Sequence, residues 1–118
     1  MLSEVRSITS TEIIDLDTYR PIDLKSFSFL LTVSVGAKGT IGQDLFNIEV
    51  CTPQWLMDNH NQAEFVLGRR KLIVFEFDMQ RILGKINSVF NGCYGKDWNE
   101  IAIKLSRIGY WEFEDYKA

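Results

Sequence analysis

The chain has little of the chemistry on which enzymes and metal proteins depend. Its 118 residues include one histidine and two cysteines. A single histidine leaves no two-histidine metal site and no good partner for a nucleophile. His60 lies among asparagines in an expected loop, where we expect it to be exposed and without a chemical role. The sequence therefore predicts no catalytic residue, no cofactor-binding residue and no metal ligand.

Two weaker signals of chemistry have plainer explanations. Asp15 with Asp17, and Glu112 with Glu114, are carboxylate pairs two residues apart, but the sequence offers no apolar pocket that would separate their pKa values for acid–base work. The segment 92–96 contains two glycines and a lysine but lacks the spacing of a phosphate-binding loop. We expect it to connect two helices. The sequence thus predicts neither an enzyme nor a small-molecule substrate.

The chain also lacks a disulfide framework, a long apolar run and a secretion signal. Cys51 and Cys93 both lie in apolar settings, where a free thiol acts as a small hydrophobic side chain. No run of about 18 apolar residues is present for a membrane span, and the first residues do not place a basic segment before an apolar one. We expect a cytoplasmic protein that does not insert into a membrane.

Positive charge is in short supply. Thirteen basic against sixteen acidic residues give a net charge of -3, whereas proteins that track nucleic-acid phosphates usually present a basic field. We therefore predict no nucleic-acid partner. Acidic residues outnumber basic ones mainly in residues 1–60, and a second acidic cluster lies near Glu112. The one basic cluster, Gly68-Arg69-Arg70-Lys71, is expected to be structural.

Hydrophobic periodicity predicts the strands. Residues 27–35 alternate strictly, and residues 46–50 alternate again after a glycine-rich segment at 36–42, which indicates an antiparallel hairpin. The run 72–77 is apolar on both sides apart from Glu76, which predicts an interior strand covered by helices. Residues 5–9 are expected to add an edge strand, and residues 110–114 to form a last strand or an extended tail.

Helix signals lie between these strands. Thr52-Pro53 marks the start of a short helix around residues 55–57. Asp78 is expected to cap a helix that ends at Asn91-Gly92, and Asp97 with Glu100 to cap another that stops at Gly109. The sequence predicts one α+β domain over residues 1–118, with a mostly antiparallel sheet of about four to five strands and two amphipathic helices packed on one face.

The tryptophans are the largest candidates for either core or interface. Trp98 lies on the apolar stripe of the last helix, and we expect it and Trp55 to belong to the core. Trp111 stands near the end of the chain beside Tyr110 and Glu112, so it has the best prospect of exposure. An exposed tryptophan there would act as an interface anchor.

Several motifs agree in order with one known family. They are the run Phe46-Asn47-Ile48-Glu49-Val50-Cys51-Thr52-Pro53-Gln54-Trp55-Leu56, then Gly68-Arg69 leading into the apolar strand, and a stretch from Trp98 through Ala102 and Arg107 to Trp111-Glu112-Phe113-Glu114-Asp115-Tyr116. In these motifs the chain resembles the immunity protein 8 family of bacterial polymorphic toxin systems. The resemblance covers nearly the whole chain, from Tyr19-Arg20-Pro21 onward.

The resemblance implies a function that composition alone does not give. A member of this family is expected to bind and neutralise one toxin, through the cognate toxin's C-terminal domain, in contact-dependent growth inhibition. A nuclease is one candidate target, and inhibition would be stoichiometric and non-covalent. The alternative is a small cytosolic adaptor domain without a toxin target, and an unrecognised enzyme comes third.

Charge alone suggests which residues would contact such a toxin. Toxins that act on nucleic acids or nucleotides usually present a cationic cleft, so acidic groups and a large aromatic side chain are the candidates. The predicted toxin-binding residues are Asp15, Asp17, Asp23, Asp44, Trp111, Glu112, Glu114 and Asp115. These residues come from charge and position, not from any site of the family.

Overall fold

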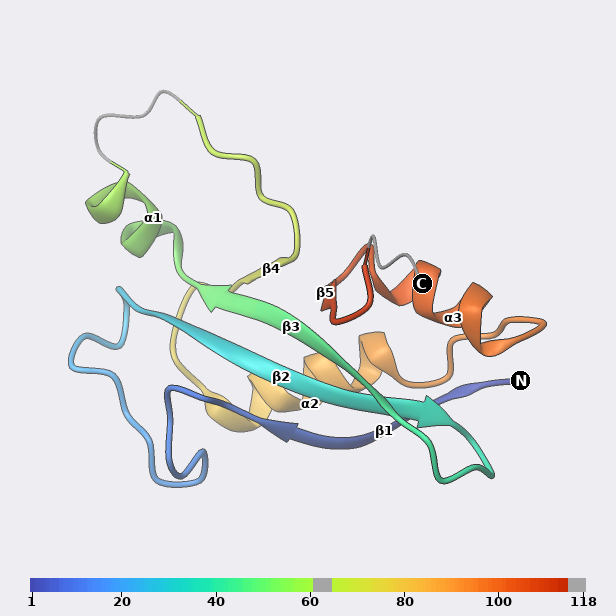
Figure 1. Ribbon diagram of the computed structural model, residues 1–118. Coiled ribbons are helices and arrows are strands. Elements are labelled where there is room, and N and C mark those ends of the chain that lie inside the picture. The colour runs from blue at the N-terminus through green and yellow to red at the C-terminus, as the bar shows by residue number, and fades with distance from the viewer. Residues whose placement is uncertain (61–64, 115–118) are drawn as a thin grey trace.

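The computed structural model describes residues 1–60 and 65–114 (Figure 1). Five strands form one sheet, and three helices accompany it. In chain order the elements are β1 (Ser3–Thr9), β2 (Ser28–Ala37), β3 (Asp44–Cys51), α1 (Pro53–Asn59), β4 (Lys71–Ile73), α2 (Met79–Phe90), α3 (Trp98–Leu105) and β5 (Tyr110–Trp111). The predicted α+β class is confirmed.

The sheet is mostly antiparallel, as predicted. Its strand order is β1-β2-β3-β4, and β5 pairs with the other half of β3. The hairpin of β2 and β3 runs from the pair Ser28 and Cys51 to the pair Val35 and Asp44. β1 is the predicted edge strand, antiparallel to β2, whereas β4 is parallel to β3. The hairpin is thus the centre of the sheet, and β1, β4 and β5 pair around it.

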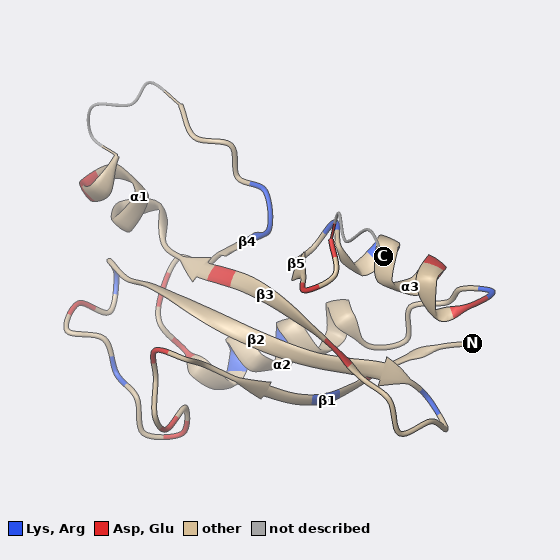
Figure 2. Ribbon diagram, in the orientation of Figure 1, with Lys and Arg blue, Asp and Glu red and all other residues tan. Residues whose placement is uncertain are grey.

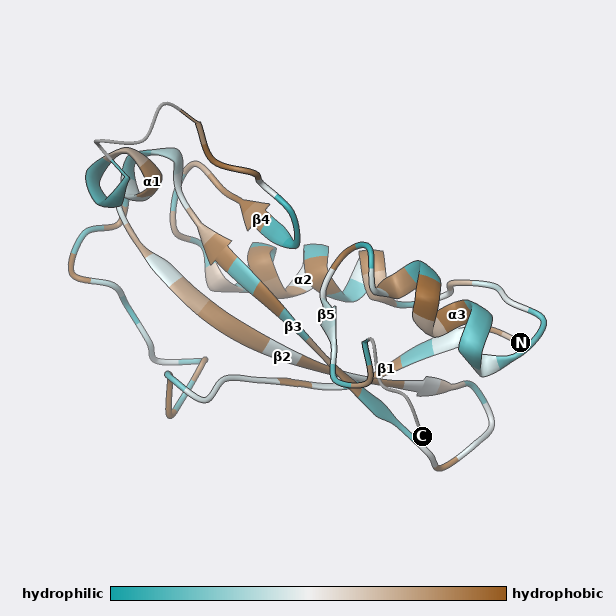
Figure 3. Cartoon of the chain, turned by 45° about the horizontal axis from the view of Figure 1, so that its top comes forward, coloured by the Kyte–Doolittle hydropathy of each residue, from teal (hydrophilic) through white to brown (hydrophobic). Residues whose placement is uncertain are grey.

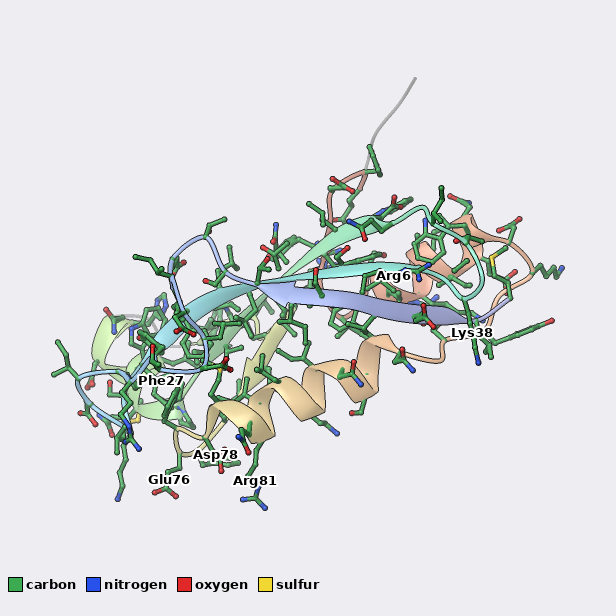
Figure 4. The ribbon with its side chains drawn as sticks, turned by 90° about the horizontal axis from the view of Figure 1, so that it is seen from below. Arg6, Phe27, Lys38, Glu76, Asp78 and Arg81 are labelled. Atoms are coloured by element: carbon green, nitrogen blue, oxygen red, sulfur yellow. The ribbon has the colours of Figure 1, made fainter. Side chains whose placement is uncertain are left out.

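Strict alternation along β2 and β3 separates two faces. The inward side chains are buried and pack with α2 and α3. The resulting core includes Phe29, Leu31, Val33, Val35, Phe46, Ile48 and Val50 of the strands, with Ile82, Ile86, Phe90, Ile101 and Leu105 of the helices. Figure 4 shows α2 lying along this face of the sheet. The other face carries polar contacts, such as the hydrogen bond from Thr32 Oγ1 to Asn47 Oδ1 at 2.7 Å. Figure 3 shows the resulting alternation of colour along β3.

The three predicted helix starts are confirmed by their caps. Thr52 Oγ1 accepts a hydrogen bond from Trp55 N at 3.1 Å. Asp78 Oδ1 accepts one from Arg81 N at 3.2 Å, and Asp97 Oδ1 accepts one from Glu100 N at 2.9 Å. Each cap satisfies a backbone donor that the first turn of a helix leaves free. None of the helices in the described ranges is long and apolar enough to cross a membrane.

The segment 72–77 departs from its prediction. It contributes only Leu72 and Ile73 to the three-residue strand β4, at the edge of the sheet, and it is not an interior strand. Val74 N still donates to Cys51 O at 2.9 Å, but Phe77 N then donates to Leu24 O at 3.0 Å, so the chain leaves β3. Ile73 and Phe75 face outward and are exposed, while alternate residues contact the core. An apolar run on both sides of a strand therefore did not indicate cover on both sides.

Two other expectations need adjustment. Trp55 is half-buried and lies outside the main core, because α1 buries none of its residues completely. The last strand is only the pair Tyr110–Trp111, followed by a turn at 112–114. A Cβ at Gly109 would lie 3.0 Å from the Asn47 carbonyl oxygen, so glycine allows the chain after α3 to approach β3 closely. That approach positions the C-terminal carboxylates.

Candidate protein-binding surfaces

The residues predicted to bind a toxin fall into two groups at different ends of the molecule (Figure 2). The loop group is Asp15, Asp17 and Asp23, all in the connection between β1 and β2. The C-terminal group is Asp44, Trp111, Glu112 and Glu114, where β3 begins and β5 pairs with it. Asp115 lies outside the described residues. The fold does not bring the two groups together, so they form two separate candidate surfaces.

The Asp44 carboxylate is hydrogen-bonded to two tryptophans of its own chain. Its Oδ2 accepts a hydrogen bond from Trp98 Nε1 at 2.7 Å and another from Trp111 Nε1 at 3.0 Å. The Trp111 ring also stacks on Phe46, with ring centroids 6.5 Å apart. One carboxylate thus joins the first turn of α3 to β5 and the start of β3. Trp111 is half-buried, so only part of its ring remains available to a partner.

The two glutamates of the C-terminal group are also engaged. Glu112 Oε1 accepts a hydrogen bond from Leu45 N at 2.9 Å, and Glu112 N donates to Leu45 O at 3.0 Å. Glu114 forms a two-pronged ion pair with Arg70, in which Arg70 Nη1 lies 2.7 Å from Glu114 Oε2. The Arg70 guanidinium also lies 4.5 Å from the centroid of the Tyr110 ring. These contacts fasten the C-terminal segment to the residue that precedes β4.

The basic cluster at 68–71 has the structural role expected for it at two positions. Arg70 has a φ of 57°, a left-handed conformation that is uncommon for a residue with a side chain. Its side chain is only 9% exposed, so the ion pair with Glu114 holds it against the sheet. Lys71 forms an ion pair with Glu49 across β3 and β4. Both pairs lie on the face of the sheet opposite the helices.

The Glu49 pair changes the pKa values of both partners. Desolvation is the largest single effect on Glu49 and favours its neutral form. The hydrogen bonds from Lys71 and Ser28, with the charge of Lys71, outweigh it and lower the pKa of Glu49 below its ordinary value. The hydrogen bond to Glu49 raises the pKa of Lys71. Both shifts favour the charged pair, which therefore stabilises the sheet between β3 and β4.

Within the described residues, the carboxylates of the loop group have no ion-pair partner and no indole donor. Asp15 Oδ1 accepts a hydrogen bond from Asp17 N at 2.9 Å, and Asp23 Oδ1 accepts one from Lys25 N at 2.8 Å. Both contacts are local turn contacts that use only one oxygen of each carboxylate. All three aspartates are exposed, and none forms an ion pair within residues 1–60 and 65–114. Their charges are available to another molecule.

Large exposed apolar side chains form a feature that charge reasoning missed. Ile22 and Phe75 are 108% and 81% exposed, and each is followed in the chain by an exposed carboxylate. A cleft of about 720 Å³ adjoins Phe75, between residues 72–78 and the residues Arg81, Ile82 and Lys85 of α2. The sequence signal for this surface is the apolar run 72–77, whose pattern predicts an interior strand instead. The surface thus combines the two residue types typical of interfaces.

The cysteines and acidic residues of the described ranges do not form a metal site. No three side chains of histidine, cysteine, aspartate or glutamate come together there in a way that could hold a metal ion. Cys51 and Cys93 are free thiols. Burial, the largest effect on Cys51, raises the pKa of its thiol, so the neutral form is favoured. Cys51 therefore fills core space beside β4.

Comparison with known protein families decides the identity of the chain. The model of one family, described as immunity protein 8, matches residues 3–116. The chain belongs to the immunity protein 8 family. The match confirms the resemblance and extends it to β1, before Tyr19. Comparisons with curated proteins and with solved structures each gave no significant match.

Family membership gives these surfaces their meaning. An immunity protein of a toxin system has a toxin protein as its partner, so its working part is a surface that fits another protein. The loop group offers free carboxylates, whereas the C-terminal group uses its carboxylates mainly to hold α3, β5 and β4 together. Of the predicted contact residues, Asp44 and Glu114 have the strongest internal roles.

Proposed function

We propose that this immunity protein neutralises its cognate toxin by stoichiometric, non-covalent binding to the toxin's C-terminal domain. Residues 1–118 would act in the cytoplasm as a single immunity domain, in a polymorphic toxin or contact-dependent inhibition system. The family match over residues 3–116 carries the proposal. The exposed carboxylates of the loop group support it, because they are ready to meet a basic partner without losing an internal ion pair.

A nuclease is the toxin class that best fits this charge. Such an enzyme binds phosphates with cationic side chains, so an acidic protein surface can cover its cleft or a surface nearby. Opposite charges raise the association rate toward about 10⁸ M⁻¹s⁻¹ at low salt, while buried aromatic contacts slow dissociation. We propose the loop group as the principal source of charge, with Trp111, Glu112, Glu114, Asp44 and Asp115 as the second set of contact residues.

Co-expression with the toxin domain encoded beside this chain tests the proposal directly. We expect the two proteins to co-purify in equal amounts and the chain to restore growth of cells that make the toxin. A titration of purified toxin separates binding from catalysis, because a stoichiometric inhibitor abolishes toxin activity only when it reaches equal amounts. Full protection at a small fraction of that amount would indicate an enzyme. A folded chain that neither binds nor protects would favour the adaptor function instead.

A further inference from the structure

We infer that the toxin contacts this protein chiefly through residues 22–24 and 75–76, and that this surface takes a basic protein surface with an apolar recess. We call these residues, Ile22, Asp23, Leu24, Phe75 and Glu76, the junction surface. The inference rests on the proposed function, since it names the surface that would serve it. It places the centre of the interface away from the C-terminal group, which holds half of the toxin-binding residues predicted from the sequence.

The two segments of the junction surface are held side by side. Phe77 N donates a hydrogen bond to Leu24 O at 3.0 Å, which joins the connection before β2 to the segment after β4. Beneath them, Phe77 makes edge-to-face contacts with Tyr19 and Phe27, at centroid distances of 6.0 and 5.6 Å. This aromatic base limits the motion of both segments. A rigid surface loses little conformational entropy when it binds.

The apolar side chains of this surface are exposed to different degrees. Ile22 is 108% exposed, Phe75 is 81% exposed and Leu24 is 40% exposed. One exposed apolar residue is ordinary on a protein surface, but several neighbouring ones rimmed by polar groups mark an interaction site. Ile73 extends the patch along the cleft of about 720 Å³ between residues 72–78 and α2. These residues can supply the buried anchors of an interface.

The acidic residues beside the anchors suit a basic partner. The exposed carboxylates here are Asp17, Asp23, Asp58, Glu76 and Asp78, against the cations Arg20, Lys25, Arg81 and Lys85, which gives five negative and four positive charges, a net of -1. Asp58 belongs to this region because its Oδ2 accepts a hydrogen bond from Ser26 Oγ at 3.0 Å. Figure 4 shows Glu76 and Asp78, just before α2, and Arg81, in its first turn, projecting away from the sheet.

Carboxylates without ion pairs favour this surface over the C-terminal group. None of these five carboxylates takes part in an ion pair within the described ranges, whereas Glu114 is paired with Arg70 and Asp44 binds two indoles. A lysine or arginine of the toxin can therefore meet Asp23 or Glu76 without breaking an existing contact. At the C-terminal group the same cation would compete with an internal partner.

Binding measurements on exposed positions test the inference. The probe is the purified toxin domain encoded beside this chain, and the quantity is the dissociation constant. We expect Ile22→Ala with Phe75→Ala to weaken binding by at least about 30-fold, the effect typical of central interface anchors. The matched control is Ile41→Ala, because Ile41 is 102% exposed in the connection between β2 and β3. It should leave binding within about twofold, the scale of energetically neutral contacts.

A charge-reversed pair supplies an independent measurement. Asp23→Lys with Glu76→Lys should slow association by about tenfold at low salt, while Glu112→Lys, in the second set of contact residues, should slow it less. Thermal unfolding checks that every variant is folded, and the lysine pair keeps the test decisive if the alanine pair is unstable. Slow association of Glu112→Lys alone would place the interface at the C-terminal group and overturn the inference.

The outcomes separate the inference from the proposed function. If the wild-type chain fails to bind the toxin domain, both the proposed function and the assignment of the junction surface are wrong. If the wild type binds and protects but the junction variants bind equally well, only the surface is wrong. If light scattering shows a wild-type dimer that the Ile22 and Phe75 changes convert to monomer, the occupant is a second copy of this chain, which also overturns the inference.

Discussion

The two ends of this protein use the same residue types for different purposes. Around α3 and β5, carboxylates lie beside tryptophans and are held by internal donors, as Asp44 is by Trp98 and Trp111. Around residues 22–24 and 75–76, carboxylates lie beside exposed apolar side chains and have no internal ion pair in the described structure. One end is therefore built mainly for stability, and the other is free for recognition.

The difference shows that an acidic residue near an aromatic one has no fixed meaning in a sequence. Asp44 finds its two donors 54 and 67 residues further along the chain. Glu114 finds Arg70 across a separation of 44 residues. The fold decides whether a donor reaches the carboxylate, and burial then makes the contact costly to lose. Where no donor arrives, as at Glu76, the charge stays available to a partner.

Removal of the Asp44 carboxylate should have the largest effect on stability at the α3 and β5 end. Asp44→Ala leaves the half-buried Nε1 groups of Trp98 and Trp111 without their acceptor. Hydrogen bonds to a charged group contribute about 1.5–3 kcal/mol each, so we expect the free energy of unfolding to fall by about 3 kcal/mol. Urea unfolding followed by tryptophan fluorescence measures it.

Two variants sharpen that test. Asp44→Asn keeps one acceptor oxygen and should lose less than Asp44→Ala. Asp23→Ala removes a carboxylate from the opposite end and should change the free energy of unfolding by less than about 0.5 kcal/mol, as is usual for exposed positions. Equal losses in Asp44→Ala and Asp23→Ala would show that the two ends do not differ in the way described.

Loss of the Glu114 charge should have a smaller effect. Glu114→Gln weakens the ion pair with Arg70, whose side chain is 9% exposed and whose backbone has a φ of 57°. We expect a loss of about 1–2 kcal/mol, because a partly buried charge loses its charged partner but keeps one polar contact. Chemical unfolding of Glu114→Gln and Glu76→Gln compares the two ends. A loss as large in Glu76→Gln as in Glu114→Gln would contradict the assignment of free and engaged carboxylates.

Local patterns in the sequence predicted much of the fold. Alternation gave the hairpin of β2 and β3, and the caps Thr52, Asp78 and Asp97 located the three helix starts. These signals work because a side chain's face and a helix's first turn depend on neighbours within a few residues. The α+β class followed from the order of those elements.

Contacts between distant residues could not be predicted in the same way. The length and edge position of β4 depend on where Cys51 and Leu24 offer backbone acceptors to Val74 and Phe77. The engagement of Asp44 and Glu114 depends on partners that only the folded chain brings near. Charge therefore located acidic candidates, but it did not distinguish occupied carboxylates from free ones, and it missed Phe75.

The smallest predicted effect concerns the dependence of stability on pH at the Glu49 and Lys71 pair. Folding lowers the pKa of Glu49, so its contribution is present above its ordinary value of 4.5 and is lost as pH falls through the folded value. The pair is partly exposed, so we expect its contribution to be below about 1 kcal/mol. Lys71→Met should reduce the loss of unfolding free energy between pH 7 and acidic conditions.

Lys25→Met is the matched control, because Lys25 is exposed and forms no ion pair within residues 1–60 and 65–114. Its free energy of unfolding should fall below pH 7 as steeply as that of the wild type, as measured by urea unfolding at each pH. The raised pKa of Lys71 acts only at alkaline pH, so it does not confuse the comparison. If Lys71→Met and Lys25→Met lost the same unfolding free energy at acidic pH, Glu49 would not count among the engaged carboxylates. The division between engaged and free acidic residues would then rest on the C-terminal group alone.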